Sequence, residues 1–452
     1  MEVLNNILSA MVSFLFGPIM LTIFFGTGIF LTIRTRGIQF RKFGAAFRAL
    51  YNGRKQNKGE GEINSLWAFA ASLSACVGVA NIAGVAAAIA VGGPGAIFWM
   101  WIAALIGMAT KYCEIVLALF YREKDKEGVW RGGAMYVLSR GMQNKSLGKF
   151  LGGFFAIAAS VVGLISCNML QTNSVVSSLS TYNIPGWAVG LVFSFLTALV
   201  VIGGVKRLGR VTSVITPLMG CVYMLAGLVV LILNADQIIP AFGMIFRSAF
   251  TTHAAEGGFA GATLQVILRT GVSRGIMSNE AGLGSSAMIH ATAQVEHPSD
   301  QGLLGIMEVF FDTIIVCTMT ALVILTTGLW NSGLTSAALS TAAFSAGLPG
   351  EWGGIIVAVS TVMFCFSTLL SWFWYGETGA VFVFGEKAAP VFRVLWVIFA
   401  FLGSVVNISV VWNAADTVNG LMFIPNLISL WLFHGIVIKL TNERFGKGEQ
   451  NQ

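Results

Sequence analysis

Long runs of apolar residues follow one another along the whole chain, separated by short polar segments. A helix needs roughly 20 apolar residues to cross the hydrocarbon core of a bilayer. By that criterion we predict eleven membrane-spanning helices, at 8–33, 65–91, 95–121, 151–181, 186–204, 212–234, 262–290, 303–329, 353–376, 391–411 and 416–440. The segments of alternating polarity that are typical of a transmembrane β-barrel are absent from the sequence. The pattern therefore predicts an all-α polytopic membrane protein, with the lipid bilayer as its surroundings.

The composition agrees with this pattern. Of the 452 residues, 56% are hydrophobic and only 10% are charged, whereas roughly 25% of residues are charged in a typical soluble chain. The mean hydropathy is +0.79. A globular protein of this length would need a more polar surface to stay in solution. The composition excludes a soluble enzyme, a nucleic-acid-binding protein and a disordered chain.

The net charge of +7 indicates topology rather than an anionic partner. Eight lysine and arginine residues lie in the segment 34–58, directly after the first apolar run. Basic segments next to membrane spans favour the cytoplasmic side. When the predicted spans alternate from there, the other basic segments also fall inside, and Arg247 is the clear exception. We therefore predict a protein of the plasma (inner) membrane with its N-terminus outside and its C-terminus in the cytoplasm.

Two of the predicted spans are interrupted by glycine and polar residues. The span 65–91 contains SLSACVGVANIAG at 72–84, and the span 262–290 contains RTGVSRGIMSNEAGLG at 269–284. Irregular backbone at membrane depth is found only where it lines a cavity inside the protein. Paired, glycine-interrupted helices at equivalent positions indicate the central site of a transporter. The alternative is that these glycines only let helices pack closely.

With the first span set aside, the interrupted spans become the first helices of two successive halves of five helices each. The expected organisation is an extra N-terminal helix (1–34), a basic cytoplasmic loop (35–62), a first five-helix repeat (63–235), an extracellular connection (236–261), a second five-helix repeat (262–440) and a cytoplasmic tail (441–452).

Neutral oxygen atoms are grouped where a small cation could bind. Ser367 and Thr368 are adjacent near the middle of the span 353–376, in the segment FCFST. Their hydroxyl groups could complete an oxygen shell together with main-chain carbonyl groups from the interruption near residues 74–78. The alternative is that both hydroxyl groups only bond to carbonyl groups of their own helix.

A zwitterionic amino acid needs N–H donors for its carboxylate and carbonyl oxygens for its ammonium group, and broken helix ends present both. Small residues there let a substrate approach the main chain. The candidate substrate-binding residues at the two interruptions are Gly78, Ala80 and Asn81, and Gly271, Gly275, Ile276 and Met277. Gln171 and Trp372 are further candidates for the pocket wall, and each could equally be a packing residue.

A few charged residues lie inside predicted spans, where they are unfavourable unless they are paired or face a wet cavity. Arg274 and Glu280 lie in the span 262–290, and Asp312 lies in the span 303–329. We expect Arg274 to pair with Glu280, Asp312 or the nearby Glu308 in a structural or gating role, and a proton relay through Asp312 is an alternative. By contrast, Lys111 and Glu114 are expected to be a snorkelling pair near the inner end of their span.

Other energy sources and chemistries have little support in the sequence. The phosphate-binding motif GxxxxGK[ST] is absent, so that an ion gradient rather than ATP is the expected energy source. No spacing typical of a nucleophile, a base and an orienting group stands out. We therefore expect a protein that is not an enzyme and has no organic cofactor.

Three longer motifs resemble the alanine or glycine:cation symporter family. They are GGPGAIFWMW at 92–101, continued by GMATKY at 107–112 as far as Glu114, RGGAMY at 131–136 and SNEAGLGSSA at 278–287. The similarity extends over nearly the whole chain. It implies a sodium-coupled importer of alanine or glycine with the 5+5 inverted-repeat fold of the bacterial leucine transporter, here preceded by one extra helix.

The resemblance also implies individual contacts. The segment 77–81 is similar to the first broken helix of the leucine transporter, which implies that Gly78 and Ala80 contact the substrate carboxylate. Ser367 and Thr368 resemble the hydroxyl pair that binds sodium in that fold, with a carbonyl from Phe364 and with Trp372 facing the substrate. The opposing carbonyl groups would come from Ser74 and Val77, or from Ala75 and Gly78 if the register differs by one residue.

Together these observations predict a secondary active symporter that imports a small neutral amino acid, alanine or glycine, with Na⁺ as the co-transported ion, by alternating access. One alternative is a proton-coupled symporter of the same fold, in which Asp312 or Glu280 would titrate. A passive channel is a second and weaker alternative, because paired helix breaks do not make a continuous polar pore.

Overall fold

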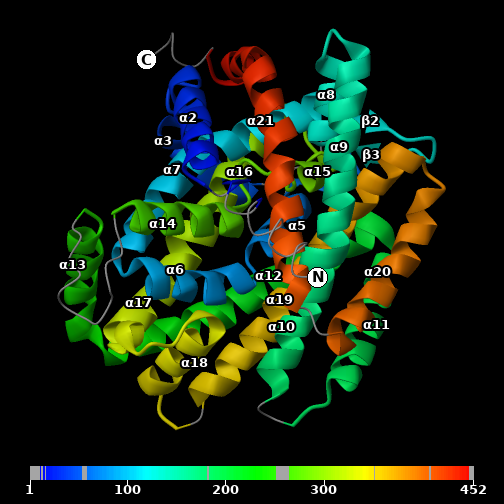
Figure 1. Ribbon diagram of the computed structural model, residues 1–452. Helices are drawn as coiled ribbons and strands as arrows, with labels where there is room; N and C mark the ends of the chain where they lie inside the picture. The colour runs from blue at the N-terminus through cyan, green and yellow to red at the C-terminus, as the bar shows by residue number, and fades with distance from the viewer. Residues whose placement is uncertain are drawn as a thin grey trace.

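The computed structural model describes residues 11, 14–15, 17–52, 59–180, 183–250, 264–350, 352–406 and 409–446, apart from the side chains of 409–416. Helices make up most of these ranges (Figure 1). The strands in them have two residues each: β1 (Ile63–Asn64), β2 (Glu123–Lys124), β3 (Trp130–Arg131) and β4 (Ala293–Gln294). Strand β1 pairs in parallel with β4, and β2 pairs in antiparallel fashion with β3. The predicted all-α fold class is confirmed.

Seven helical segments of the described chain are long and apolar enough to cross a membrane. They are α7 (Gly95–Phe120), α9 with η2 and α10 (Lys145–Leu179), α12 (Gly204–Leu233), α16 with η5 and α17 (Pro298–Thr326), α19 (Trp352–Phe384), α20 (Ala388–Val405) and Thr417–Phe445 of α21 (Ser409–Phe445). A bent pair can form an eighth span, and α2 (Pro18–Arg34) and α11 (Gly186–Val201) are shorter apolar helices. The count of eleven spans therefore stays a prediction.

Several helices of the described chain have internal boundaries or connect the spans. The long composite spans divide into α9 (Lys145–Leu164), η2 (Ile165–Met169) and α10 (Leu170–Leu179), and into α16 (Pro298–Val309), η5 (Phe310–Cys317) and α17 (Thr318–Thr326). The shorter elements are α3 (Ile38–Arg41), α4 (Phe43–Asn52), α8 (Ala134–Gly141), η4 (Ala235–Gln237), α13 (Ile238–Ser248), η6 (Leu329–Asn331) and α18 (Ser336–Gly347).

The predicted interruption of the span 65–91 is confirmed. Helix α5 (Ser65–Cys76) ends where Val77 adopts an extended backbone (φ −74°, ψ 92°). The chain becomes helical again in η1 (Ala80–Gly84) and α6 (Val85–Gly92), bent by 48° from α5. We call residues 77–79 the first break.

The interruption of the span 262–290 lies in the C-terminal part of the predicted segment 269–284 and beyond the residues 271–277 that were assigned to it. Helix α14 (Leu264–Asn279) is continuous through Gly271 and Gly275. The chain leaves the helix at Glu280 (φ +58°), passes through two positive-φ glycines at 282 and 284, and becomes helical again in α15 (Ala287–His290). We call residues 280–286 the second break.

The expected break at Gly271–Met277 was wrong because the glycines there serve helix packing. A Cβ atom on Gly271 would collide with the main-chain carbonyl oxygen of Ala96 on α7, and one on Gly275 would lie 3.2 Å from Met100 Cγ. Absence of a side chain therefore lets α14 approach α7 closely, as small residues do between membrane helices.

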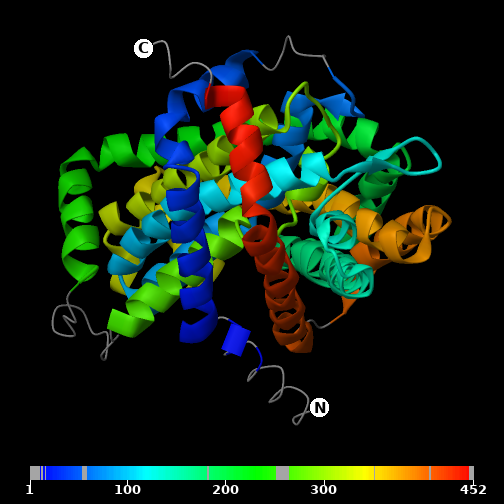
Figure 2. The same cartoon turned by 90° about the horizontal axis from the view of Figure 1, so that it is seen from above.

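The two breaks lie in the interior of the molecule, since residues 77–78 and 280–286 are all buried. Helix α19 packs against α5, α9 and α12, while α7 packs against α14 and α16. The N-terminal helix α2 lies against α7 and α21, where Phe30 stacks on Trp431 at 4.2 Å between ring centroids. In Figure 2, α2 and α21 (blue and red) converge toward their C-terminal ends.

Candidate functional site

A cavity of about 1270 Å³ lies beside the first break. Its lining comes from the first break, α10, the C-terminal end of α14, α18, α19 and α21. Of the residues predicted to bind substrate, those that line it are Gly78, Ala80, Gln171, Met277, Thr368 and Trp372. Asn81, Gly271, Gly275 and Ile276 are buried outside its described lining. The cavity therefore gathers residues from both halves of the chain next to a helix break.

Beside this cavity, α5 and α19 bring five residues together that we call the neutral cluster: Ser74, Phe364, Ser367, Thr368 and Ser371. The Thr368 hydroxyl donates to the Ser74 carbonyl oxygen at 3.1 Å. The Ser367 hydroxyl lies 3.0 Å from the Phe364 carbonyl oxygen and 3.4 Å from that of Ser74. All five residues are buried. Four were predicted as sodium ligands, and the structure brings these four together.

Ser371 is the member that the sequence analysis missed. Its hydroxyl oxygen lies 2.6 Å from the Ser74 hydroxyl oxygen. Ser371 lies four residues after Ser367, so both residues lie on the same face of the helix. This spacing could have indicated from the sequence that Ser371 belongs to the cluster. The cluster thus offers hydroxyl and carbonyl oxygens without any fixed charge, which is a donor set suited to a hard monovalent cation. Val77, the fifth predicted ligand, ends α5 next to the cluster.

The first break is held in place by Asn81. The Gly78 amide donates to Asn81 Oδ1 at 2.8 Å, and Asn81 Nδ2 donates to Asp312 Oδ1 at 2.7 Å. A Cβ atom on Gly78 would lie 2.8 Å from Thr368 Oγ1. Glycine at position 78 therefore allows the main chain to lie directly on the Thr368 hydroxyl.

Asp312 joins the first break to the end of α14. Besides Asn81, it accepts hydrogen bonds from the hydroxyl groups of Ser278 at 2.8 Å and Thr313 at 2.7 Å. It is fully buried and is outside the described lining of the cavity. All three partners donate hydrogen bonds to the Asp312 carboxyl group. These contacts favour a structural role, in which Asp312 connects η1 to the end of α14.

A second polar group, which we call the charged cluster, lies where α5, α7, α15 and α16 meet. Its members are Lys111, Glu308, His290, Ser72, Cys76 and Ser286. Lys111 Nζ lies 3.0 Å from Glu308 Oε1 and donates to Ser286 Oγ at 2.7 Å. The Lys111 side chain is 0% exposed, so the predicted snorkelling role for Lys111 was wrong. The lysine points inward because Glu308, 197 residues away, is its partner.

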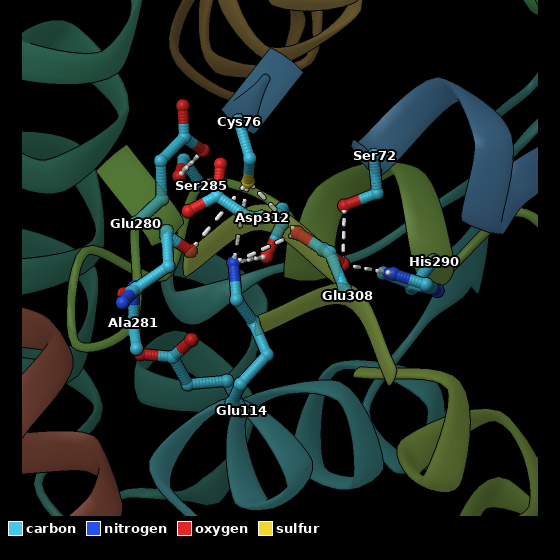
Figure 3. A network of polar contacts seen from close by, with 12 residues as sticks. Ser72, Cys76, Glu114, Glu280, Ala281, Ser285, His290, Glu308 and Asp312 are labelled. Carbon is cyan, nitrogen blue, oxygen red and sulfur yellow. Dashed lines mark hydrogen bonds and ion pairs between the residues drawn. The ribbon is translucent and has the colours of Figure 1, made fainter. Parts of the chain in front are cut away.

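The other oxygen of Glu308 is also fully used. It accepts from Ser72 Oγ at 2.8 Å and lies 2.9 Å from His290 Nε2 (Figure 3). The amide Nε2 of Gln301 lies 2.8 Å from His290 Nδ1. The charged cluster is therefore a closed network around one lysine–glutamate pair.

Glu114 ties α7 to the second break instead of pairing with Lys111. Its Oε1 accepts from the Gly282 amide at 2.8 Å and from Asn426 Nδ2 at 2.6 Å. The second predicted snorkelling residue is thus a buried brace, 3% exposed, between α7, the second break and α21.

Arg274 and Glu280 both line the cavity. Glu280 Oε1 accepts from Trp372 Nε1 at 2.7 Å, and Glu280 Oε2 accepts from Ser285 Oγ at 2.6 Å. Arg274 contacts Met277 Sδ at 3.9 Å. Among the residues that the structure describes, it forms no ion pair with Glu280, Glu308 or Asp312. The expected pairing of Arg274 is not formed because Lys111 pairs with Glu308 and hydroxyl and amide groups surround the other two carboxyl groups.

The amino-acid sequence of the chain is similar to those of known proteins. A model of the sodium:alanine symporter family matches residues 1–452. The chain is 43% identical to the sodium/alanine symporter AgcS of Methanococcus maripaludis, over 95% of this chain and 94% of that protein. It is 34% identical to the probable sodium/glutamine symporter GlnT of Bacillus subtilis, over 96% and 90% of the two chains.

A solved structure is similar to the fold. The crystal structure of MhsT in complex with L-phenylalanine superposes with a TM-score of 0.59. The two sequences are 14% identical, and the match covers 84% of this chain and 98% of MhsT. The chain thus has the fold of this leucine transporter-like protein.

Proposed function

Since the chain belongs to the sodium:alanine symporter family, we propose that it imports a small neutral amino acid, alanine or glycine, together with Na⁺. The family is one of multi-pass membrane transporters and not of enzymes, in keeping with the apolar helices. The relatives' names include both alanine and glutamine as substrates. The proposal of a small substrate therefore rests on the cavity and not on the names alone.

Thr368 is the residue that carries the proposal. Its hydroxyl belongs to the neutral cluster, and the same residue lines the cavity. A sodium ion held by Ser74, Val77, Phe364, Ser367 and Thr368 would order the first break against α19 and thereby form one wall of the substrate pocket. Binding of the ion and of the substrate would then favour each other, which is the coupling that a symporter needs.

The first break suits the substrate carboxylate. Helix η1 begins at Ala80, and the first amide groups of a helix have no partner inside it. A helix N-terminus that presents N–H groups favours an anion. Met277 and Trp372 line the same cavity as Gly78, and their bulky side chains would limit the room for a substrate side chain. These features support alanine or glycine over a large amino acid.

Two cavities meet at the first break, which supports alternating access. Gly78 lines the large cavity, while the neighbouring Val77 lines a second cavity of about 1000 Å³. The large cavity reaches α18, and the second reaches Glu62 and Asn64 at the start of α5. Consecutive residues of the first break therefore line different cavities, as we would expect if this break took part in alternating access.

The proposed orientation, with the basic segments in the cytoplasm, is supported by contacts between them. Lys206 pairs with Glu62 at 3.3 Å, and Arg122 donates to the Glu60 carbonyl oxygen. The Lys42 ammonium group lies 5.6 Å from the centre of the Phe445 ring. Segments that were assigned to one side of the membrane thus lie on one face of the molecule, and we propose that this face is cytoplasmic.

Purified protein in liposomes tests the function. With an inward sodium gradient, labelled alanine should accumulate above its equilibrium level, and glycine should compete better than phenylalanine. Replacement of sodium by choline at constant pH should abolish accumulation. Uptake that is unchanged without sodium, or that follows a proton gradient alone, would contradict the proposal.

A further inference from the structure

Two charged residues line the large cavity among the residues that the structure describes, Arg274 and Glu280. They lie on one segment, the end of α14 and the start of the second break. Arg274 is partly exposed, whereas Glu280 is 4% exposed. A nearly buried carboxyl group at the wall of a membrane cavity needs either a proton or a cation beside it.

The backbone at Glu280 is unusual for its residue type. Its φ of +58° lies in the left-handed region, which residues other than glycine, asparagine and aspartate rarely adopt. Such backbone persists where the surrounding structure holds it in place. Here Trp372 and Ser285 hold the side chain, and the α14 hydrogen bond from the Glu280 amide to the Ile276 carbonyl oxygen holds the main chain.

The carboxylate retains unused acceptor capacity. A carboxylate accepts about four hydrogen bonds, and Glu280 accepts one on each oxygen, from Trp372 and from Ser285. Within the described residues, no lysine, arginine or histidine side chain forms an ion pair with it. The remaining acceptor sites, on a carboxyl group that lines the cavity and has no ion-pair partner among the described residues, point to a cationic group that comes from the cavity.

We propose that Glu280 receives the ammonium group of the transported amino acid. This assignment rests on the proposed function. It specifies which group of the substrate binds at the second break. An ammonium group would donate to the free acceptor sites of Glu280 while the substrate carboxylate lies at the start of η1. Glu280 and the first break would thus hold opposite ends of the zwitterion, and the site would take α-amino acids and reject carboxylates without an amine.

An ammonium group fits this place better than a second sodium ion. A bare cation needs several oxygen ligands, and the cavity residues nearest in sequence to Glu280, Met277 and Leu283, have no side-chain oxygen. The two hydrogen-bond partners of the carboxylate are themselves donors.

Glu280→Gln tests the assignment, because glutamine keeps the size and the acceptor for Trp372 but removes the charge. Sodium-driven alanine uptake should show a KM raised by roughly 10- to 100-fold, as expected when a charge-assisted hydrogen bond is lost. The sodium concentration for half-maximal uptake, measured at saturating alanine, should stay within about 2-fold of wild type. Propionate, which lacks the ammonium group, should inhibit the variant and the wild type equally weakly.

Ser285→Ala is the matched control, since it removes the other hydrogen bond to Glu280 and leaves the charge. It should raise KM for alanine by less than Glu280→Gln does, because the charge that pairs with the ammonium group remains. If Glu280→Gln does not fold, Glu280→Asp, which keeps the charge but shortens its reach, should still raise KM.

Three results would overturn the assignment: an unchanged KM in the folded Glu280→Gln or Glu280→Asp variant, a raised sodium requirement at unchanged KM, or an equal KM change in Ser285→Ala. Failure of the wild type to take up alanine with sodium would instead contradict the proposed function. The two failures are therefore distinguishable.

Discussion

The neutral cluster and the charged cluster both include a serine of α5, and these two serines are only two residues apart. The two clusters nevertheless differ in whether they contain charged side chains. Ser74 of α5 belongs to the neutral cluster, and Ser72 contacts Glu308 of the charged cluster. The charged cluster contains its own cation, Lys111, whose ammonium group is bonded to Glu308 and Ser286. The neutral cluster contains oxygens and no cation of its own.

This difference indicates which cluster keeps its contacts permanently and which one can bind and release an ion. A buried ion pair with every partner satisfied resists opening, because separating it leaves a charge without a partner. A group of neutral oxygens can gain and lose an ion, because loss of the ion leaves no buried side-chain charge without a partner. We therefore expect the charged cluster to fix α5 to α7 and α16, and the neutral cluster to respond to sodium.

The largest expected effect comes from Lys111→Met, which leaves Glu308 buried without its cation. The free energy of unfolding should fall by about 3–5 kcal/mol, the usual penalty for breaking a buried pair on one side. Heating in detergent followed by size-exclusion chromatography should show a clearly lower Tm, and uptake should be lost.

The double variant Lys111→Met, Glu308→Gln is its control, because it removes both charges. It should recover part of the lost thermal stability. A single Lys111→Met variant with the Tm of the wild type would show that the charged cluster does not fix the helices.

Ser367→Ala combined with Thr368→Ala should affect sodium far more than stability. Loss of two oxygen ligands should raise the sodium concentration for half-maximal uptake by at least roughly 10-fold, equivalent to about 1.4 kcal/mol of ion binding. Thermal unfolding without sodium should change little.

Ser367→Ala alone distinguishes an effect on sodium binding from an effect on substrate binding. Ser367 is outside the described lining of the cavity, whereas Thr368 is part of it. It should raise the sodium requirement without changing KM for alanine at saturating sodium. A changed alanine KM with an unchanged sodium requirement would assign the hydroxyl pair to the substrate.

The matched pair Ser72→Ala and Ser74→Ala compares the two clusters most directly. Ser72→Ala removes a hydrogen bond to a carboxylate and should lower the free energy of unfolding by about 1–3 kcal/mol with an unchanged sodium requirement. Ser74→Ala keeps the main-chain carbonyl, so the sodium requirement should rise only by roughly 2- to 5-fold. Thermal unfolding and sodium titration of uptake measure both variants, and equal effects of the two would erase the distinction between the clusters.

Much of the fold was predictable because its signals are local. A membrane helix satisfies its own backbone hydrogen bonds, so a run of apolar residues is enough to indicate it. The first break was predicted correctly because glycine and polar residues interrupt the apolar run at 72–84. Four of the proposed sodium ligands also come together, since the adjacent hydroxyl groups of Ser367 and Thr368 share one helix.

Tertiary structure alone decided the rest. A glycine lets a helix break and lets a helix pack closely, and only the position of α7 shows that Gly271 and Gly275 serve packing, so that the second break falls at Glu280. The partner of Lys111 is likewise fixed by how α7 and α16 pack, across 197 residues of sequence. The sequence by itself determined where helices form and where the first one breaks, because those properties depend on neighbouring residues. Helix packing decided which buried charged residues form ion pairs, because an ion pair depends on distance in space and not on distance along the sequence.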